Sequence, residues 1–488
     1  MTRSAGPPAL LLPTALSIAL SGAGCAVEAR DTRPPMVVIS LDTLRADRLG
    51  AYGGPEGLTP NLDRFAEEAV VFEAAYAQAN ETLFSHASLF TSRYPSELGR
   101  LTYDFQLAEE GPPTLAEVLA LYGYTTGAVT AGGQLTEGMG LDRGFDDWSE
   151  PADWGSLYHT IPPGLAWLDE AREGDAPWLL FLHGYDTHHR YLKPTPFGLL
   201  DADPEYRGVG EEAALDPTGT ARIFGDWLHP TRELGALFDF REPRLLGEGF
   251  NTRLRAAVGS PGSRALPLGS GAHGFLRGVY DGSVRYADAM FGVLMAELEA
   301  RGVLDEAVIV VLSDHGESLG ERGWYNHRYS LTDEDLHVPL MIRLPGEAQT
   351  GGLRVAEPVA LLDVAPTLLE LAGAAPLADG RGRSLLGPVD EIPSPFVFSE
   401  GAFRAVSARG PEGRLTFTGV GADSPWLGEL IAMHPPESPA LVGEGDVAHL
   451  QAAMVDWRRG LSPPPESATR TDPALRQELR RRGYWGME

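Results

Sequence analysis

The chain has almost no cysteine and few basic side chains. Cys25 is the single cysteine among 488 residues, so no disulfide can form within one chain. Lys and Arg together number 39 against 68 Asp and Glu, which gives a formal net charge of −29. Proteins that bind nucleic acid need a basic surface to meet the phosphates, so we expect no nucleic-acid partner. The acidic excess is typical of a well-solvated surface.

The sequence also has no apolar run after its first 25 residues that is long enough to cross a bilayer. Its start instead has the pattern of an export signal: Arg3, a mostly apolar stretch over 9–20, small residues at 21–24, and then Cys25. A cysteine in this place resembles a bacterial lipoprotein signal, although Gly22 stands where Leu is usual. We therefore expect Cys25 to be lipidated, and the protein to be exported and held in the periplasm or on the cell surface by this lipid alone. The alternative is an ordinary signal peptide in which Cys25 is incidental.

Four continuous apolar runs predict strands that are buried on both faces: 36–41, 178–182, 307–312 and 338–342. The last contains Pro339 and is expected near a sheet edge, because proline cannot donate to the ladder. Helical patterns lie between the runs, over 59–69, 114–121 and 286–298. Strands that alternate with helices predict an α/β fold, a three-layer sandwich with a large mixed, mostly parallel sheet.

Three of these runs end in residues that carry chemistry. Asp42 follows the first, His183 and Asp186 lie at the end of the second, and Asp314 and His315 follow the third. Ligands of such sheets bind beyond the carboxyl ends of the strands. Carboxylates and an imidazole at this edge can hold a divalent cation, so the sequence predicts a site here.

The order of several motifs resembles the sulfatase branch of the alkaline phosphatase superfamily over roughly residues 36–390. The motifs are Ser-Leu-Asp-Thr-Leu-Arg-Ala-Asp at 40–47, Thr-Leu-Phe-Ser-His-Ala-Ser-Leu-Phe-Thr at 82–91 and Asp-His-Gly-Glu at 314–317. Supporting similarities lie at 144–146, 181–188, 363–369, 382–386 and 479–484. The resemblance implies an alkaline-phosphatase-like sheet and a metal-assisted attack on an ester.

By this resemblance, Asp42, Asp314 and His315 are metal ligands, and Thr82 is the nucleophile and a fourth ligand. The remaining candidates face the substrate. His188 and His327 match histidines that protonate the leaving oxygen or hold the non-bridging oxygens of the ester. Residues expected to contact the anion itself are His86 and Arg328.

The sequence departs from true sulfatases at the nucleophile. Those enzymes carry Cys or Ser at the position of Thr82 and convert it to formylglycine, whereas the extra methyl of threonine prevents that conversion. Sulfatases also have a second Asp at Thr43 and often Asn at His315. The set found here resembles phosphotransferring relatives, in which a threonine alkoxide forms a phosphothreonine. A helix that begins near Thr82 would favour the anion through its dipole.

These observations predict a metal-dependent hydrolase that cleaves a phosphate (di)ester or a sulfate ester through Thr82. Imidazole ligation favours Mn²⁺ or Zn²⁺, with Ca²⁺ as the alternative. One rival is a transferase of phospho-alcohol groups, although such relatives usually carry several transmembrane helices. Another is a lipoprotein that binds an anionic glycan without turnover. The substrate is expected to be a small anionic ester, a glycan or a lipid head group.

The expected domain organisation follows from these assignments. Residues 1–25 form the lipoprotein-type signal, and 26–35 a linker. The sulfatase-like catalytic domain covers 36–393, with an insertion at about 190–273 whose Arg and aromatic content is expected to set the substrate. Short apolar runs at 396–398 and 414–418 predict a smaller C-terminal subdomain over 394–488.

Overall fold

The computed structural model describes most of the predicted catalytic domain and part of the C-terminal region. The described residues are 31–99, 105–188, 270–321, 325–327, 331–346, 351–387, 396–401, 405–410, 413–417 and 444–465, together with 191, 193, 197 and 477. The predicted signal, Cys25, most of the insertion, Arg328 and the motif at 479–484 lie outside them. The predicted domain boundaries therefore remain predictions.

In the described part of the chain, eight strands form one sheet in the order β11-β2-β10-β7-β1-β6-β4-β5. Their bounds are β1 Met36–Leu41, β2 Val70–Phe72, β4 Thr125–Val129, β5 Asp147–Ser149, β6 Trp178–Gly184, β7 Val308–Leu312, β10 Leu340–Arg343 and β11 Arg354–Val355. The strands from β7 to β5 run parallel, and β10 is antiparallel to both its neighbours. The sheet is therefore mixed and mostly parallel, as predicted.

The strand with Pro339 was predicted near a sheet edge because of its proline, but β10 is paired on both sides. β10 lies between β7 and β2, two places from the edge. Its paired residues begin at Leu340, one residue after the proline. The missing N–H of Pro339 therefore falls outside the ladder, and its carbonyl oxygen accepts a hydrogen bond from the Ser313 amide at 3.3 Å.

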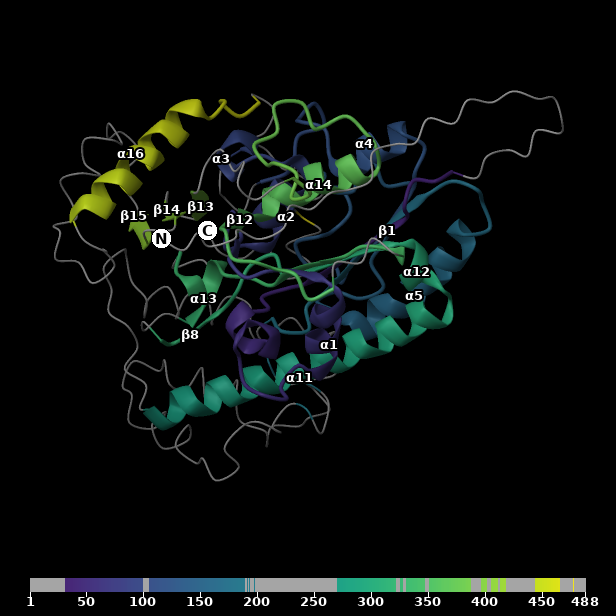
Figure 1. The fold of residues 1–488 in the computed structure, drawn as a ribbon, viewed down its shortest axis with the longest axis horizontal. Helices are drawn as coiled ribbons and strands as arrows, with labels where there is room; N and C mark the ends of the chain where they lie inside the picture. Colours follow the sequence, from purple (N-terminus) through teal and green to yellow (C-terminus); the bar gives the residue numbers. More distant parts are fainter. Residues whose placement is uncertain are drawn as a thin grey trace, which may run out of the picture.

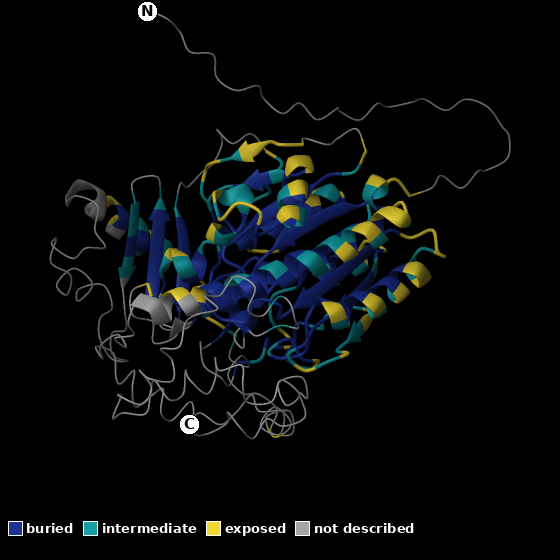
Figure 2. Cartoon of the chain, turned by 90° about the horizontal axis from the view of Figure 1, so that it is seen from below, coloured by how far each residue is buried: buried dark blue, intermediate teal, exposed yellow. Residues whose placement is uncertain are grey.

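Helices cover both faces of the sheet (Figure 1). On one face, the apolar side chains of α2 Thr82–Thr91, α4 Leu115–Leu121 and α14 Val364–Leu371 pack against Val38, Val310 and Phe181 of the central strands. On the other, α1 Pro60–Glu68, α5 Leu157–Ala171 and α11 Ser270–Ala300 pack against Ile39, Ile309 and Leu180. Strand side chains alternate between the two cores, which is why the central strands are apolar at nearly every position. Figure 2 shows the buried sheet between helices whose outer surfaces are exposed.

The predicted helices are present, with altered limits. Thr114 caps α4 by accepting a hydrogen bond from the Glu117 amide at 3.1 Å, and the Glu117 side chain accepts one from the Thr114 amide at 2.8 Å. The helix predicted over 286–298 is the second half of α11, which begins at Ser270 within the predicted insertion. Across the described residues, no helix combines the length and apolar character needed to cross a bilayer.

A small antiparallel sheet follows the main one, in agreement with the predicted C-terminal strands. It contains β13 Val397–Gly401, β14 Ala405–Gly410 and β15 Gly413–Phe417, and α16 Glu444–Gly460 packs on it through Leu450 and Met454. Short elements complete the described fold: β3 Ala75–Tyr76, β8 Ser318–Leu319, β9 Tyr325–Asn326, β12 Val359–Ala360, α3 Pro95–Leu98, α12 Val303–Glu306, α13 Asp333–Leu336, and the 3-10 helices η1 Ala46–Arg48, η2 Gly50–Tyr52 and η5 Leu361–Asp363.

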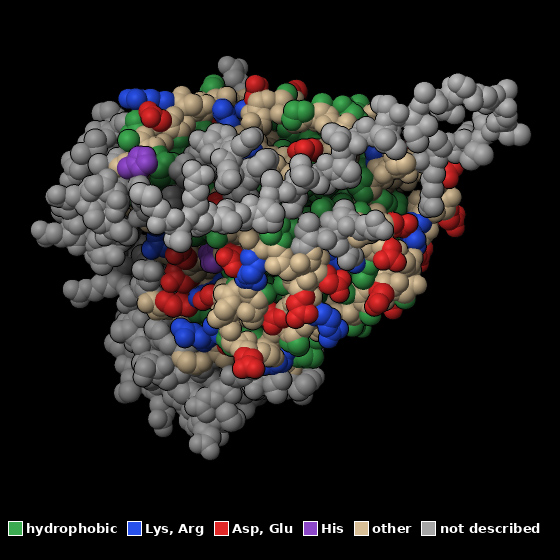
Figure 3. Space-filling view, viewed as in Figure 1, with side chains coloured by type: hydrophobic (Ala, Val, Ile, Leu, Met, Phe, Trp, Pro, Cys, Tyr) green, Lys and Arg blue, Asp and Glu red, His purple; other side chains and the backbone are tan. Residues whose placement is uncertain are grey.

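The surface agrees with the acidic composition. Figure 3 shows Asp and Glu side chains mixed with Lys and Arg over the described part of the face in view.

Candidate active site

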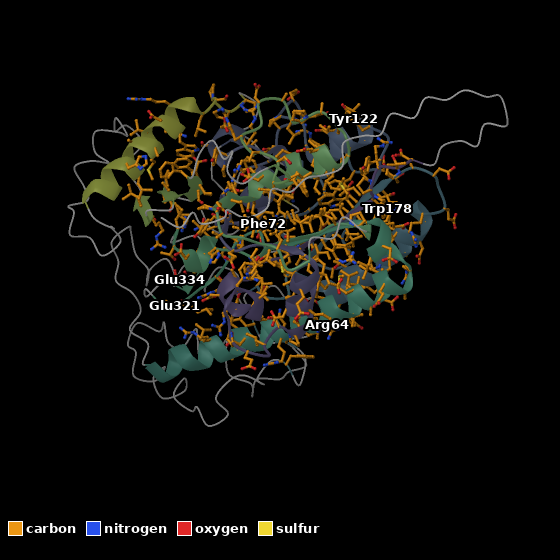
Figure 4. The ribbon with its side chains drawn as sticks, in the orientation of Figure 1. Arg64, Phe72, Tyr122, Trp178, Glu321 and Glu334 are labelled. Atoms are coloured by element: carbon orange, nitrogen blue, oxygen red, sulfur yellow. The ribbon has the colours of Figure 1, made fainter. Side chains whose placement is uncertain are left out.

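The candidate site lies where β1, β6 and β7 end. Ser40 pairs in register with His183 on one side and with Leu312 on the other, so the three strands end at one level. In Figure 4, Trp178, at the start of β6, lies at the opposite end of the molecule from Glu334. The carbonyl oxygen of Glu334 accepts a hydrogen bond from the amide of Glu317, which follows the end of β7. The carboxyl edge of the sheet is thus the end at which Glu334 is found.

Three predicted ligands meet at this edge. Ligand atoms of Asp42, Asp314 and His315 lie within 4.8 Å of one another, and all three side chains are fully buried. The local backbone arranges them. Thr43 has a φ of 59°, a strained value for a β-branched residue, and its amide donates to Asp314 Oδ1 at 3.3 Å. His315 Nδ1 donates to the Gly316 carbonyl oxygen at 2.9 Å, which leaves Nε2 as the atom available to a metal.

Thr82 lies beside this group as the first residue of α2. Its hydroxyl donates to Asp42 Oδ2 at 2.9 Å and is 3.4 Å from His315 Nε2. The next amide, that of Leu83, donates to Gln134 Oε1 at 3.0 Å. Because the partial positive charge of a helix lies at its N-terminus, this position favours an anion on or next to the threonine oxygen.

The donor set fits a divalent cation. Asp42 Oδ1 and Asp314 Oδ2 are buried and accept no hydrogen bond from an N–H or O–H group. Burial raises the pKa of Asp42 to about 6. Burial also raises the pKa of Asp314, and the neighbouring charge of Asp42 adds to this rise. Two buried carboxylates side by side are costly unless a cation compensates them, and carboxylate with imidazole suits Mn²⁺ or Zn²⁺.

Two opposing effects act on the pKa of the third ligand, His315. Burial on its own would lower the pKa of His315, but the carboxylates of Asp314 and Asp42 outweigh it and raise that pKa. The same two charges would hold a metal cation in place of a proton, so proton and metal compete for one position.

Two further histidines lie behind the ligands. His86, which we predicted to contact substrate, is fully buried, and its Nε2 is 2.9 Å from Ser40 Oγ while its Nδ1 is 2.7 Å from the Thr82 carbonyl oxygen. Both ring nitrogens are thus engaged within the protein, which points to support of the Thr82 backbone and not to a substrate contact. His183 Nε2 is 3.4 Å from Asp42 Oδ2. Burial lowers the pKa of each to about 4, so both rings are neutral near pH 7.

The two predicted substrate-side histidines lie next to each other. The rings of His188 and His327 have centroids 5.2 Å apart, and the ring of His327 is 4.5 Å from that of His315. His188 also lies against the Trp154 ring at 5.2 Å. Both histidines thus come from different loops to the same side of the ligand group, whereas Arg328 and Cys25 lie outside the described residues.

Sequence reasoning gave no role to three residues that the structure brings to the site. Glu317 Oε1 is 3.1 Å from His327 Nδ1, Gln134 holds the start of α2, and Ser40 holds His86. Glu317 was visible within the motif at 314–317, but nothing in the spacing pairs it with a histidine ten residues later. The other two contacts join segments far apart in the chain.

Comparisons with known proteins identify the family of the chain. The family model for sulfatases matches residues 34–374, well over half of the 488-residue chain. An N-acetylglucosamine-6-O-sulfatase of Bacteroides thetaiotaomicron is 27% identical over 432 residues, covering 78% of this chain and 75% of the relative.

Solved structures share the fold. A phosphonate monoester hydrolase of Agrobacterium radiobacter superposes with a TM-score of 0.62 at 20% identity, over 88% of this chain and 95% of the other. The C-terminal periplasmic domain of EcEptC from Escherichia coli, determined in complex with zinc, has a TM-score of 0.52 at 16% identity, over 76% and 90% of the two chains. The family match, which covers more than half of the chain, shows that the chain belongs to the sulfatase family of ester hydrolases.

Proposed function

We propose that the protein is a metal-dependent hydrolase of phosphate or phosphonate esters in which Thr82 is the nucleophile. The observation that carries the proposal is the position of Thr82. Thr82 is the first residue of α2. Its Oγ1 donates to Asp42 Oδ2 at 2.9 Å and lies 3.4 Å from His315 Nε2. A threonine cannot become the formylglycine that sulfate cleavage uses in true sulfatases, so the alkoxide route to phosphorus is favoured.

Asp42, Asp314, His315 and Thr82 would hold the cation, and their donor set favours Mn²⁺ or Zn²⁺ over Ca²⁺. When bound, such a cation lowers the pKa of a ligated hydroxyl and polarises the ester oxygens. The partial positive charge at the start of α2 stabilises the negative charge that develops beside Thr82. The backbone of Thr82 is held by His86 and its orientation by Asp42, so the attacking oxygen is fixed before substrate arrives.

His188 and His327 would divide the remaining tasks between them. One protonates the oxygen that leaves, and the other donates a hydrogen bond to a non-bridging oxygen of the ester. The bond from Thr82 Oγ to phosphorus forms as the bond to the leaving oxygen breaks. Water then cleaves the phosphothreonine and restores the hydroxyl.

Sulfate ester hydrolysis is the second candidate, since the relative from Bacteroides thetaiotaomicron is named as a sulfatase. The neighbour from Agrobacterium radiobacter is instead named as a phosphonate monoester hydrolase. Matched substrates separate the two: 4-nitrophenyl sulfate, bis(4-nitrophenyl) phosphate and 4-nitrophenyl phenylphosphonate, each with Mn²⁺ or Zn²⁺.

The controls are Thr82→Ala, which removes the nucleophile, and Thr82→Ser, which keeps a hydroxyl. We expect turnover of the phosphorus esters by the wild type and by Thr82→Ser, and none by Thr82→Ala. Turnover of the sulfate ester alone would overturn the argument from the missing Cys or Ser. Tight binding of an anionic glycan without turnover of any ester would identify a binding protein instead.

Export and lipidation at Cys25 complete the proposal, because the first 25 residues have the pattern of a lipoprotein signal. Metabolic labelling with a fatty acid tests this point: a Cys25→Ser variant should lose the label and the membrane association.

A further inference from the structure

Glu317 is a fully buried carboxylate that the proposed reaction leaves without a task. It lies two residues after His315, in the loop that follows β7. Its Oε1 is 3.1 Å from Nδ1 of His327, and its Oε2 is buried and accepts no hydrogen bond. The carboxylate therefore contacts the Nδ1 side of the His327 ring, which is the side opposite to Nε2.

Several groups fix Glu317 in this position. Arg45, itself almost fully buried, donates from Nη1 to the Glu317 carbonyl oxygen at 3.0 Å. The Glu317 amide donates to the Glu334 carbonyl oxygen at 2.9 Å. A carboxylate whose backbone is held on both sides in this way can in turn hold the ring that it contacts.

We infer that Glu317 is a positioning residue that orients the His327 ring towards the leaving oxygen of the ester. This inference rests on the proposed function. It also distinguishes the two substrate-side histidines, because it assigns proton donation to His327 and leaves the non-bridging oxygens to His188. The arrangement follows the general logic of an imidazole whose second nitrogen is held by a carboxylate.

The chemistry balances in both halves of the reaction. Before the first half, the Thr82 hydroxyl loses its proton to solvent. The Thr82 alkoxide then bonds to phosphorus, the bond from phosphorus to the leaving oxygen breaks, and the Nε2 proton of His327 goes to that oxygen. In the second half, water attacks the phosphothreonine and gives one proton back to Nε2, and the bond from phosphorus to Thr82 Oγ breaks and releases the alkoxide, which takes up a proton from solvent again.

The experiment compares leaving groups, because a proton donor matters most for a poorly stabilised leaving oxygen. The full chain, loaded with Mn²⁺ or Zn²⁺, is assayed with methyl 4-nitrophenyl phosphate and with methyl phenyl phosphate. 4-Nitrophenol is a much stronger acid than phenol, so the nitrophenolate anion leaves without a proton donor. In Glu317→Gln, we expect kcat/KM to fall about 100-fold on the phenyl ester and less than about 10-fold on the nitrophenyl ester.

Two further variants keep the result interpretable. Glu400→Gln removes a carboxylate that is also buried but lies in β13 of the small sheet, and should leave the ratio of the two substrates unchanged. His327→Ala should show the same leaving-group dependence, and adding Glu317→Gln to it should cause no further loss. An equal loss on both esters in Glu317→Gln, or additive losses in the double variant, would overturn the inference. Absence of Thr82-dependent turnover in the wild type would instead overturn the proposed function.

Discussion

The two buried carboxylates at the site predict an unusual pH dependence of stability when no metal is bound. Burial raises the pKa of Asp42 from 3.8 to about 6. This rise corresponds to about 3 kcal/mol, at about 1.4 kcal/mol for each tenfold change in proton affinity. The folded chain binds this proton more tightly than the unfolded chain does. The contribution of protonated Asp42 to the free energy of unfolding is therefore fully present below about pH 4, and it is lost as the pH rises through about 6.

The perturbation is Asp42→Asn, which keeps the shape of the side chain and removes its charge. Unfolding entropy of about 2 cal/mol/K per residue gives roughly 1 kcal/mol/K for a chain of this length. A loss of about 3 kcal/mol therefore corresponds to about 3 °C. With chelator present, the melting temperature of the wild type should fall by about 3 °C more between pH 4 and pH 7.5 than that of the variant. Metal at 100 times its Kd should raise the wild-type melting temperature by a further ~3 °C, equivalent to about 2.7 kcal/mol, and leave the variant unchanged.

Thermal unfolding followed by fluorescence, with and without chelator, measures both effects. Asp363→Asn is the matched control, because burial also raises the pKa of Asp363 to about 6 but this residue lies at the start of α14. It should alter the pH dependence and keep the full response to metal. Parallel curves of melting temperature against pH for chelated wild type and Asp42→Asn would refute the reasoning.

Three other perturbations test the structure independently. In Gly316→Ala, the added Cβ would lie 2.1 Å from the Glu334 carbonyl oxygen, so the loop beside His315 must shift and elemental analysis should find the metal lost; Gly274→Ala, with open space at its Cβ, should keep it. Chelation should abolish ester turnover, and added Mn²⁺ or Zn²⁺ should restore it. Ca²⁺ should not restore turnover, because imidazole is a poor Ca²⁺ ligand. Restoration by Ca²⁺ alone would contradict the assigned donor set. Phe181→Ala, in the buried centre of β6, should destabilise the fold by about 3–5 kcal/mol in denaturant unfolding, and a loss below about 1 kcal/mol would show that the core collapses around the cavity.

The central strands and their end residues were predictable because burial on both faces leaves a strong signal. Residues 36–41 are apolar or small throughout, and β1 there is flanked by β6 and β7. The residues that follow such strands must lie together when the strands are parallel and in register. The sequence alone therefore predicts that Asp42, Asp314 and His315 form one group.

Contacts between loops were not predictable, because they depend on the course of the chain between elements. His86 was read as a substrate contact from its place in a motif, but a helix that starts at Thr82 turns residue 86 back towards Ser40. The contact of Glu317 with His327 depends on how the chain returns after β8, which no periodicity reports. Pro339 shows the same limit, since a shift of one residue decides whether a proline interrupts a ladder.

Covalent trapping at Thr82 tests the central claim most directly. The purified protein is incubated with bis(4-nitrophenyl) phosphate and the metal, quenched in acid within the first turnovers, digested, and examined by mass spectrometry. We predict a nitrophenylphosphoryl group on Thr82 that disappears when the substrate is exhausted and is absent in Thr82→Ala. Turnover of the ester by Thr82→Ala at the wild-type rate, or the label on a residue other than Thr82, would contradict the assignment of the nucleophile.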